Sequence, residues 1–227
     1  MLFRISAACA QAYPDAHAGV LAMRNVTNPA HHAGLDERKT QLEAQLRARF
    51  AGQDRQAIKE LALIQAYNAY YKHFDKTYHV QLQLESIAFK NKALPSVAAL
   101  VEAMFMAEVK NMLLTAGHDY DKLQFPITLG VATGEEHYTV MRGQDQALKA
   151  GDMYMADGAG IISSILYGPD QRTQIGEATR NVIFTVYAPA GISEQRVLEH
   201  LGDIQSNVQW VTSEAQVELL QVYAAKS

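Results

Sequence analysis

The sequence has only one cysteine, Cys9, among its 227 residues, so no internal disulfide can form. A single domain of this length buries about 70% of the surface of its unfolded chain and needs no such crosslink. No apolar run approaches the roughly 20 residues that a membrane-spanning helix requires. The opening stretch MLFRISAACA is a poor export signal because Arg4 interrupts its short apolar run. These absences favour a reducing, cytoplasmic setting without a membrane partner.

Positive charge is not in excess either. Lysine and arginine number 20 against 24 acidic residues, which gives a net charge of −4. Proteins that coat nucleic acid non-specifically carry a strong basic excess, so the balance argues against that class. It leaves open an enzyme that meets the end of a tRNA through a local group of arginines.

Several catalytic motifs are missing as well. The sequence contains no G-x-S-x-G elbow, H-E-x-x-H pair, Walker loop or G-x-G-x-x-G. The glycine-rich ADGAGII joins two expected strands, which favours a hairpin over a dinucleotide loop. His17, His31 and His32 have no acidic or thiol partner at ligand spacing, so we expect no metal and no cofactor.

The first half of the chain is mainly helical by pattern. Leu42, Leu46 and Phe50 recur every four residues, and Gly52 follows the last turn of that helix. The same reasoning predicts a helix from residue 96 to 115, with Ser96 as its N-cap. In order, we expect strands at 2–7 and 19–25 and helices at 35–52, 56–74, 82–92 and 96–115.

From Pro126 the apolar period changes to two. Short β-branched and aromatic runs follow one another, separated by glycine and aspartate. Because no helices intervene, the strands should be mostly antiparallel and the class α+β, with the N-terminal helices packed on the sheet. We expect one domain, helix-rich over about 1–120 and strand-rich over about 121–227. Near its end we expect a helix from Ser193 to Ile204, a strand at 208–211 and a further strand in EAQVELLQVYA.

Tyr67, Tyr70, Tyr71 and Phe74 lie beside basic residues on the second helix. Aromatic and basic side chains together can stack nucleic-acid bases. At helical spacing, however, such aromatic residues more often form core, and we expect core here.

Four consecutive polar residues, His118-Asp119-Tyr120-Asp121, separate the helix expected at 96–115 from the first strand of the second half. They could form a chemical site. They could equally be a turn after a helix that Gly117 caps in the left-handed conformation.

Four stretches resemble, in order and spacing, the editing module of the phenylalanyl-tRNA synthetase beta subunit. LPSVAALVEAMFMAEV is similar to the helix before the family's histidine, and GHDYDKL is similar to its His-x-aromatic-Asp segment. The segment that ends in Ala156-Asp157 resembles a hairpin of that module, and Thr179 with Asn181 matches its Thr-x-Asn. The resemblance runs from about residue 70 to 193 and implies a free-standing form of the module.

The sequence departs from the family at one point. Where the synthetase carries a glutamate associated with its editing pocket, Gln171 stands here. If a carboxylate is required, Asp170 or Glu177 would have to supply it.

The resemblance implies hydrolysis of the ester of a mischarged tRNA, at its 3′ aminoacyl end. That ester is already activated, so positioning of water and preorganised donors can suffice without a nucleophile. The alternatives are a non-catalytic module that binds tRNA or a free amino acid, and a hydrolase of another small ester or amide. The residues assigned by the resemblance are His118 and Asn181 for catalysis, Tyr120, Asp157, Asp170, Gln171 and Thr179 for substrate, and Arg142, Arg172 and Arg180 for nucleic acid.

Overall fold

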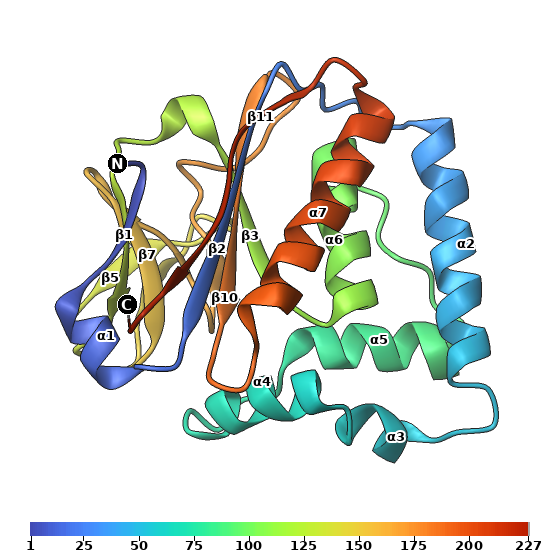
Figure 1. Ribbon diagram of the computed structural model, residues 1–227, viewed down its shortest axis with the longest axis horizontal. Helices are drawn as coiled ribbons and strands as arrows, with labels where there is room; N and C mark the ends of the chain where they lie inside the picture. The colour runs from blue at the N-terminus through green and yellow to red at the C-terminus, as the bar shows by residue number, and fades with distance from the viewer. Residues whose placement is uncertain (227) are drawn as a thin grey trace.

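Two sheets and a layer of helices make up the structure, a computed structural model that describes residues 1–226 (Figure 1). A four-stranded sheet lies in the middle, with α2, α6 and α7 on one side and the strands of a second sheet on the other. The described chain begins and ends on the side of the second sheet. Among the described residues, none of the helices is long and apolar enough to cross a membrane.

The middle sheet has the order β11-β2-β10-β3, and every pair in it is antiparallel. Its two central strands are buried along nearly their whole length because both faces are covered. Continuous apolar runs such as GVLAM and VIFTVYA suit this position. The strands are β2 (His17–Arg24), β3 (Leu114–Asp119), β10 (Asn181–Ala188) and β11 (Gln216–Ala224).

The second sheet has five strands in the order β1-β4-β7-β8-β9. Its first pair is parallel and the others are antiparallel. The strands are β1 (Phe3–Ile5), β4 (Ile127–Val131), β7 (Met153–Asp157), β8 (Gly160–Ser164) and β9 (Gly168–Pro169), with a separate hairpin of β5 (His137–Thr139) and β6 (Asp145–Ala147).

The helices α6 and α7 cover the outer face of the middle sheet (Figure 1). Gly19 on β2 allows the close approach, since a Cβ there would lie 2.5 Å from Val197 Cγ1 of α7. The helices are α1 (Ala7–Ala12), α2 (Ala33–Arg49), α3 (Arg55–Lys59), α4 (Ala62–Lys72), α5 (His79–Lys90), α6 (Ala99–Asn111) and α7 (Glu194–Val211), with a 3-10 turn η1 (Tyr120–Lys122).

This architecture confirms the α+β class and the mostly antiparallel pairing. The strands expected at 2–7 and 19–25 are present as β1 and β2. The sheet expected over 126–223 also includes β2 and β3 from the first 120 residues, which flank β10. The expected hairpin in ADGAGII is confirmed, and the Asp157 carboxylate accepts the amide hydrogens of Ala159 and Gly160 at its turn.

The helix expected at 96–115 is shorter, which changes the setting of His118. It ends when Met112 takes a left-handed conformation (φ 59°), and its amide donates to the Glu108 carbonyl. The chain then enters β3, so Gly117 is a strand residue and no helix cap. At the other end Ser96 is not the cap either. The N-cap is Ala98, and the side chain of Asn28, distant in sequence, accepts the Leu100 amide hydrogen at 2.9 Å.

Two further boundaries were predicted wrongly. The helix expected at 56–74 is broken at Glu60–Leu61 into α3 and α4. The strand expected at 208–211 is the last turn of α7, because Ile204 and Val208, one helical turn apart, are both buried. The core interpretation of the aromatic run is confirmed, since its four rings are 0–6% exposed.

Candidate functional site

His118 lies on β3 between the two sheets and is 0% exposed. Its Nδ1 is 2.8 Å from Thr173 Oγ1, whose own hydrogen goes to Asp170 Oδ1. Because a hydroxyl has one hydrogen to give, His118 Nδ1 must be the donor, which leaves Nε2 unprotonated. This Nε2 is buried and has no hydrogen-bond partner among residues 1–226.

An ion cluster formed by Arg172 borders this histidine. The guanidinium binds Asp157 at 2.8 Å, lies 3.7 Å from Asp170 and donates to the Lys122 carbonyl at 2.9 Å. The structure therefore brings together four of the residues named from the sequence. They are His118, Asp157, Asp170 and Arg172.

The protonation states in this cluster follow from burial and charge. Burial lowers the pKa of His118 to about 3, so the imidazole is neutral at physiological pH. Burial raises the pKa of Asp170. Burial also tends to raise the pKa of Asp157. Hydrogen bonds from backbone amides and from Arg172 outweigh this effect, so the pKa of Asp157 lies below its usual value. His118 is therefore a neutral, buried imidazole with Nδ1 bound to Thr173 and Nε2 without a partner among residues 1–226, beside the Arg172–Asp157 ion pair.

Thr179, Asn181 and Tyr120 lie in a second group, at the end of the middle sheet. Thr179 Oγ1 donates to Asp119 at 2.7 Å, and the Asn181 amide donates to both oxygens of Asp121, at 3.0 and 2.8 Å. The Asn181 side chain is on the same sheet face as His118, since His118 pairs with Ile183 two residues along. Among residues 1–226 the two side chains have different hydrogen-bond partners, and no hydrogen bond joins them.

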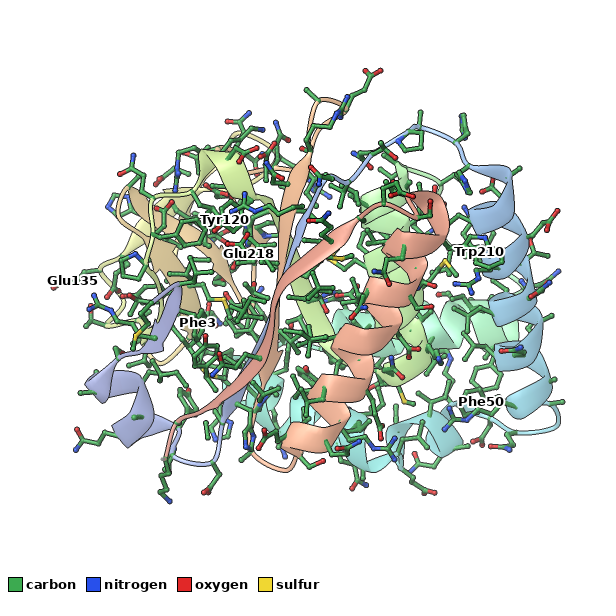
Figure 2. All side chains as sticks on the ribbon, turned by 45° about the horizontal axis from the view of Figure 1, so that its top comes forward. Phe3, Phe50, Tyr120, Glu135, Trp210 and Glu218 are labelled. Carbon is green, nitrogen blue, oxygen red and sulfur yellow. The ribbon has the colours of Figure 1, made fainter. Side chains whose placement is uncertain are left out.

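Arg24 holds the outer side of this second group. Its guanidinium lies 3.5 Å from the centre of the Tyr120 ring and pairs with Glu218 of β11. Figure 2 shows Tyr120 and Glu218 side by side at this end of the sheet. Tyr120 is therefore a partly buried residue that holds η1 against β11 through Arg24 and Glu218.

The remaining residues named from the sequence lie on the surface. Arg142 is exposed at the β5–β6 turn, and Arg180 donates to the carbonyls of Glu177 and Thr179. Gln171 is exposed beside an open hollow of about 380 Å³ that is also lined by Arg172 and Asp170. All three arginines named for nucleic acid are exposed, and Arg172 is also paired with Asp157.

A larger cavity, of about 470 Å³, lies at the free edge of β3. Helices α5 and α6 form one wall, and the β8–β9 segment forms another. Most of the lining is apolar, including Val101, Met104 and Phe105 of α6. Two exposed apolar side chains, Val97 and Met141, stand at its mouth. Size, concavity and apolar lining are those of a small-molecule site.

Glu108 of α6 is the buried charge-bearing residue in the cavity wall, with 2% of its surface exposed. Its Oε1 accepts the Thr115 amide hydrogen at 2.8 Å, and no basic side chain among residues 1–226 pairs with it. Burial raises its pKa to about 8. Thr115 also lies 2.6 Å from the Nε2 of buried His200, whose pKa burial lowers to about 4.

Sequence reasoning missed Glu108 and its cavity. A signal was present, because the mostly apolar α6 carries two acids in its interior, Glu102, which pairs with Lys39, and Glu108. An acid in such a helix has to be buried, and buried acids need a partner or a function. Among residues 1–226, no group of three or more His, Cys, Asp or Glu side chains is placed to hold a metal ion.

Comparison with known proteins gives a distant fold resemblance. No family model matches the sequence, and no curated protein does. Among solved structures, the chain is similar to an N-terminal fragment of the phenylalanyl-tRNA synthetase beta subunit from Pyrococcus horikoshii. The TM-score is 0.48 and the identity 10%, over 96% of this chain and 54% of that one. The chain thus spans about half the length of that fragment.

Proposed function

We propose that this protein binds a small, largely apolar molecule in the cavity at the free edge of β3. The observation that carries the proposal is the cavity itself, about 470 Å³ of mainly apolar surface with Glu108 in its wall. A ligand seated on a concave apolar surface of this size removes both surfaces from water, which favours binding. The exposed Val97 and Met141 at the mouth extend the same apolar surface outward.

The ligand class that we propose is an aminoacyl group, presented at the 3′ end of a tRNA. Support comes from the order of the four sequence stretches that resemble the editing module. The cavity can take the amino-acid side chain, while the ribose and phosphates stay outside. Arg142 and Arg180 are exposed and can contact phosphates, whereas the guanidinium of Arg172 forms an ion pair with Asp157.

Binding without hydrolysis fits the geometry better than the catalytic assignment of His118 and Asn181. His118 is fully buried, is bound to Thr173 and is not part of the cavity lining, whereas general base catalysis needs contact with the attacking water. Asn181 is held by Asp121. Hydrolysis of mischarged tRNA remains the second candidate, with Glu108 in place of His118, because its raised pKa suits proton transfer near neutrality.

The test uses a panel of aminoacylated tRNAs, with Val101→Trp as the variant that fills the cavity. Val101 is half-buried in the cavity wall, so a larger side chain can occupy the free volume. We expect wild type to bind some members more tightly than the uncharged tRNA, and the variant to lose that preference. Equal binding of charged and uncharged tRNA by wild type would contradict the proposed ligand. Release of the amino acid by wild type alone would establish the second candidate.

Any tRNA binding should be weak and strongly salt-dependent. With a net charge of −4, a few local phosphate contacts must supply the electrostatic attraction. We expect the affinity to fall by about tenfold or more between 50 and 200 mM salt, in line with a small number of phosphate contacts. Filter binding at these salt concentrations measures it, and an affinity independent of salt would contradict contact through phosphates.

A further inference from the structure

The ionisable side chains around the cavity are mainly acidic. The lining contains Glu108 in the wall, Glu177 at the mouth and His79 of α5, whose pKa burial lowers, and no lysine or arginine of residues 1–226. A ligand with a free carboxylate would lose its hydration without gaining a counter-ion, which is costly in an apolar site. The cavity therefore disfavours anions, free amino acids among them.

Glu108 is placed to bind a hydrogen-bond donor from the cavity side. Its Oε1 is occupied by the Thr115 amide, while its Oε2 has no hydrogen bond and is not among the side-chain atoms sealed from solvent. A carboxylate oxygen can accept more than one hydrogen bond. Gln83 in the same lining has a buried Oε1 without a partner in residues 1–226, which adds a second acceptor.

The edge of β3 supplies further acceptors. Successive amide hydrogens point to opposite sides of a strand. Those of Thr115 and Asp119 point away from β10, where the first donates to Glu108 and the second to the Thr173 carbonyl. By the same alternation the N–H and C=O of Gly117 point out of that edge, where Gly117 lines the cavity. Carbonyl oxygens at an unpaired edge accept hydrogen bonds from a ligand.

We infer that the cavity selects an apolar ligand that carries a primary ammonium group and no free carboxylate, with Glu108 as its counter-ion. An apolar amine meets this description, and so does an amino acid whose carboxyl is blocked as an ester or amide. The inference rests on the proposed function and goes beyond it, since it specifies the charge of the ligand and the residue that binds the charged group. Charge-assisted hydrogen bonds to a buried carboxylate favour such a ligand over a neutral one of the same shape.

Calorimetric titration of wild type with four probes that share a phenylethyl group tests the inference. The probes are 2-phenylethylamine, phenylalanine methyl ester, phenylalanine and the neutral 2-phenylethanol. We expect the amine and the ester to bind about tenfold or more tighter than the alcohol, and free phenylalanine to bind weakest, as a charged hydrogen bond implies. Because wild type alone is used, the comparison does not depend on a variant that folds.

Glu108→Gln then identifies the counter-ion, and Glu177→Gln is its matched control at the exposed mouth. Glu108→Gln should weaken the amine by about tenfold or more and leave the alcohol within about twofold, since only the charge is removed. In wild type we expect amine binding near pH 7 to release a proton, measurable in buffers of different ionisation enthalpy, because Glu108 has a pKa of about 8 and must ionise to pair with the ammonium. Glu108→Gln should lose this proton release. Equal affinities of wild type for amine and alcohol would overturn the charge inference alone. Binding of none of the four probes would overturn the small-molecule site as well.

Discussion

At the scale of single residues, Glu108 and His118 are both fully buried ionisable groups with different surroundings. His118 donates to Thr173 and is sealed between the sheets, whereas Glu108 keeps one oxygen toward a cavity. Sequence reasoning could name His118 because it stands in a polar segment. It could not show that β3 buries it, since that depends on pairing with β10 some sixty residues later.

His118→Ala should destabilise the fold. It removes the partner of Thr173 and leaves a cavity between the sheets, which together cost about 2–4 kcal/mol of unfolding free energy. Urea denaturation measures the change, with exposed His137→Ala as a control that should stay within about 0.5 kcal/mol. An unchanged stability, combined with lost hydrolysis of aminoacyl-tRNA, would instead restore the catalytic role.

Glu108 should make the stability of wild type fall as the pH rises from about 5 to 8. Its folded-state pKa of about 8 lies above the ordinary value of 4.5, so the folded protein holds a proton that the unfolded chain has released. Stability then declines through this window by up to a few kcal/mol and levels off above it. Glu108→Gln should remove this part of the decline in urea denaturation, whereas Glu177→Gln should keep it. Parallel profiles for wild type and Glu108→Gln would contradict an acid buried in its neutral form.

At the scale of elements, the local patterns located most helices and strands, and the errors have a common cause. The start of α6 was predicted at Ser96 from a local cap, but Asn28 serves as the cap from seventy residues away. Likewise the helix expected at 96–115 overlaps the start of β3, whose pairing partner β10 lies far along the chain. Contacts between distant segments decided these boundaries, and a single sequence does not display them. The cavity is formed by the same kind of contacts between distant segments. Its only sign in the sequence is therefore Glu108, an acid within an apolar helix.

Asn28 should be important for the α6 terminus and the mouth of the cavity. It accepts from the Leu100 amide and donates to the Gly176 carbonyl at 3.0 Å, and it is 4% exposed. We expect Asn28→Ala to lower the unfolding free energy by about 1–3 kcal/mol, because both partners lose a buried hydrogen bond. Thermal or urea unfolding measures this effect.

Asn28→Asp separates the two bonds of Asn28. The carboxylate still accepts from Leu100 and suits the positive end of the helix, but it cannot donate to Gly176. Its stability should lie between those of wild type and Asn28→Ala. If Asn28→Asp is less stable than Asn28→Ala, the capping role is wrong.

At the scale of the whole molecule, the chain passes back and forth between its two sheets. β1 lies in the five-stranded sheet and β2 in the four-stranded one, and the rings of Phe3 and Tyr223 meet between the sheets at 4.8 Å. Neither sheet is built from a continuous part of the sequence. We therefore propose that residues 1–227 form a single domain that unfolds cooperatively.

We expect one unfolding transition. Trp210, the sole tryptophan, lies on α7 at the helical side, under the Arg38 guanidinium (Figure 2). Its fluorescence reports that side, whereas far-UV circular dichroism reports all layers. The two midpoints in urea should coincide, as for a two-state domain. Separate midpoints would show that the helical layer unfolds independently.

The central claim, that the cavity at the free edge of β3 binds a small molecule, is tested most directly by methyl NMR. With ¹³C-labelled methionine methyl groups, Met104 in the wall and Met141 at the mouth report the cavity, while Met23 and Met153 report the core elsewhere. Titration with 2-phenylethanol should shift the first two signals saturably and leave the other two in place, and Val101→Trp should abolish the shifts. Unshifted Met104 and Met141 signals at saturating probe would contradict the account.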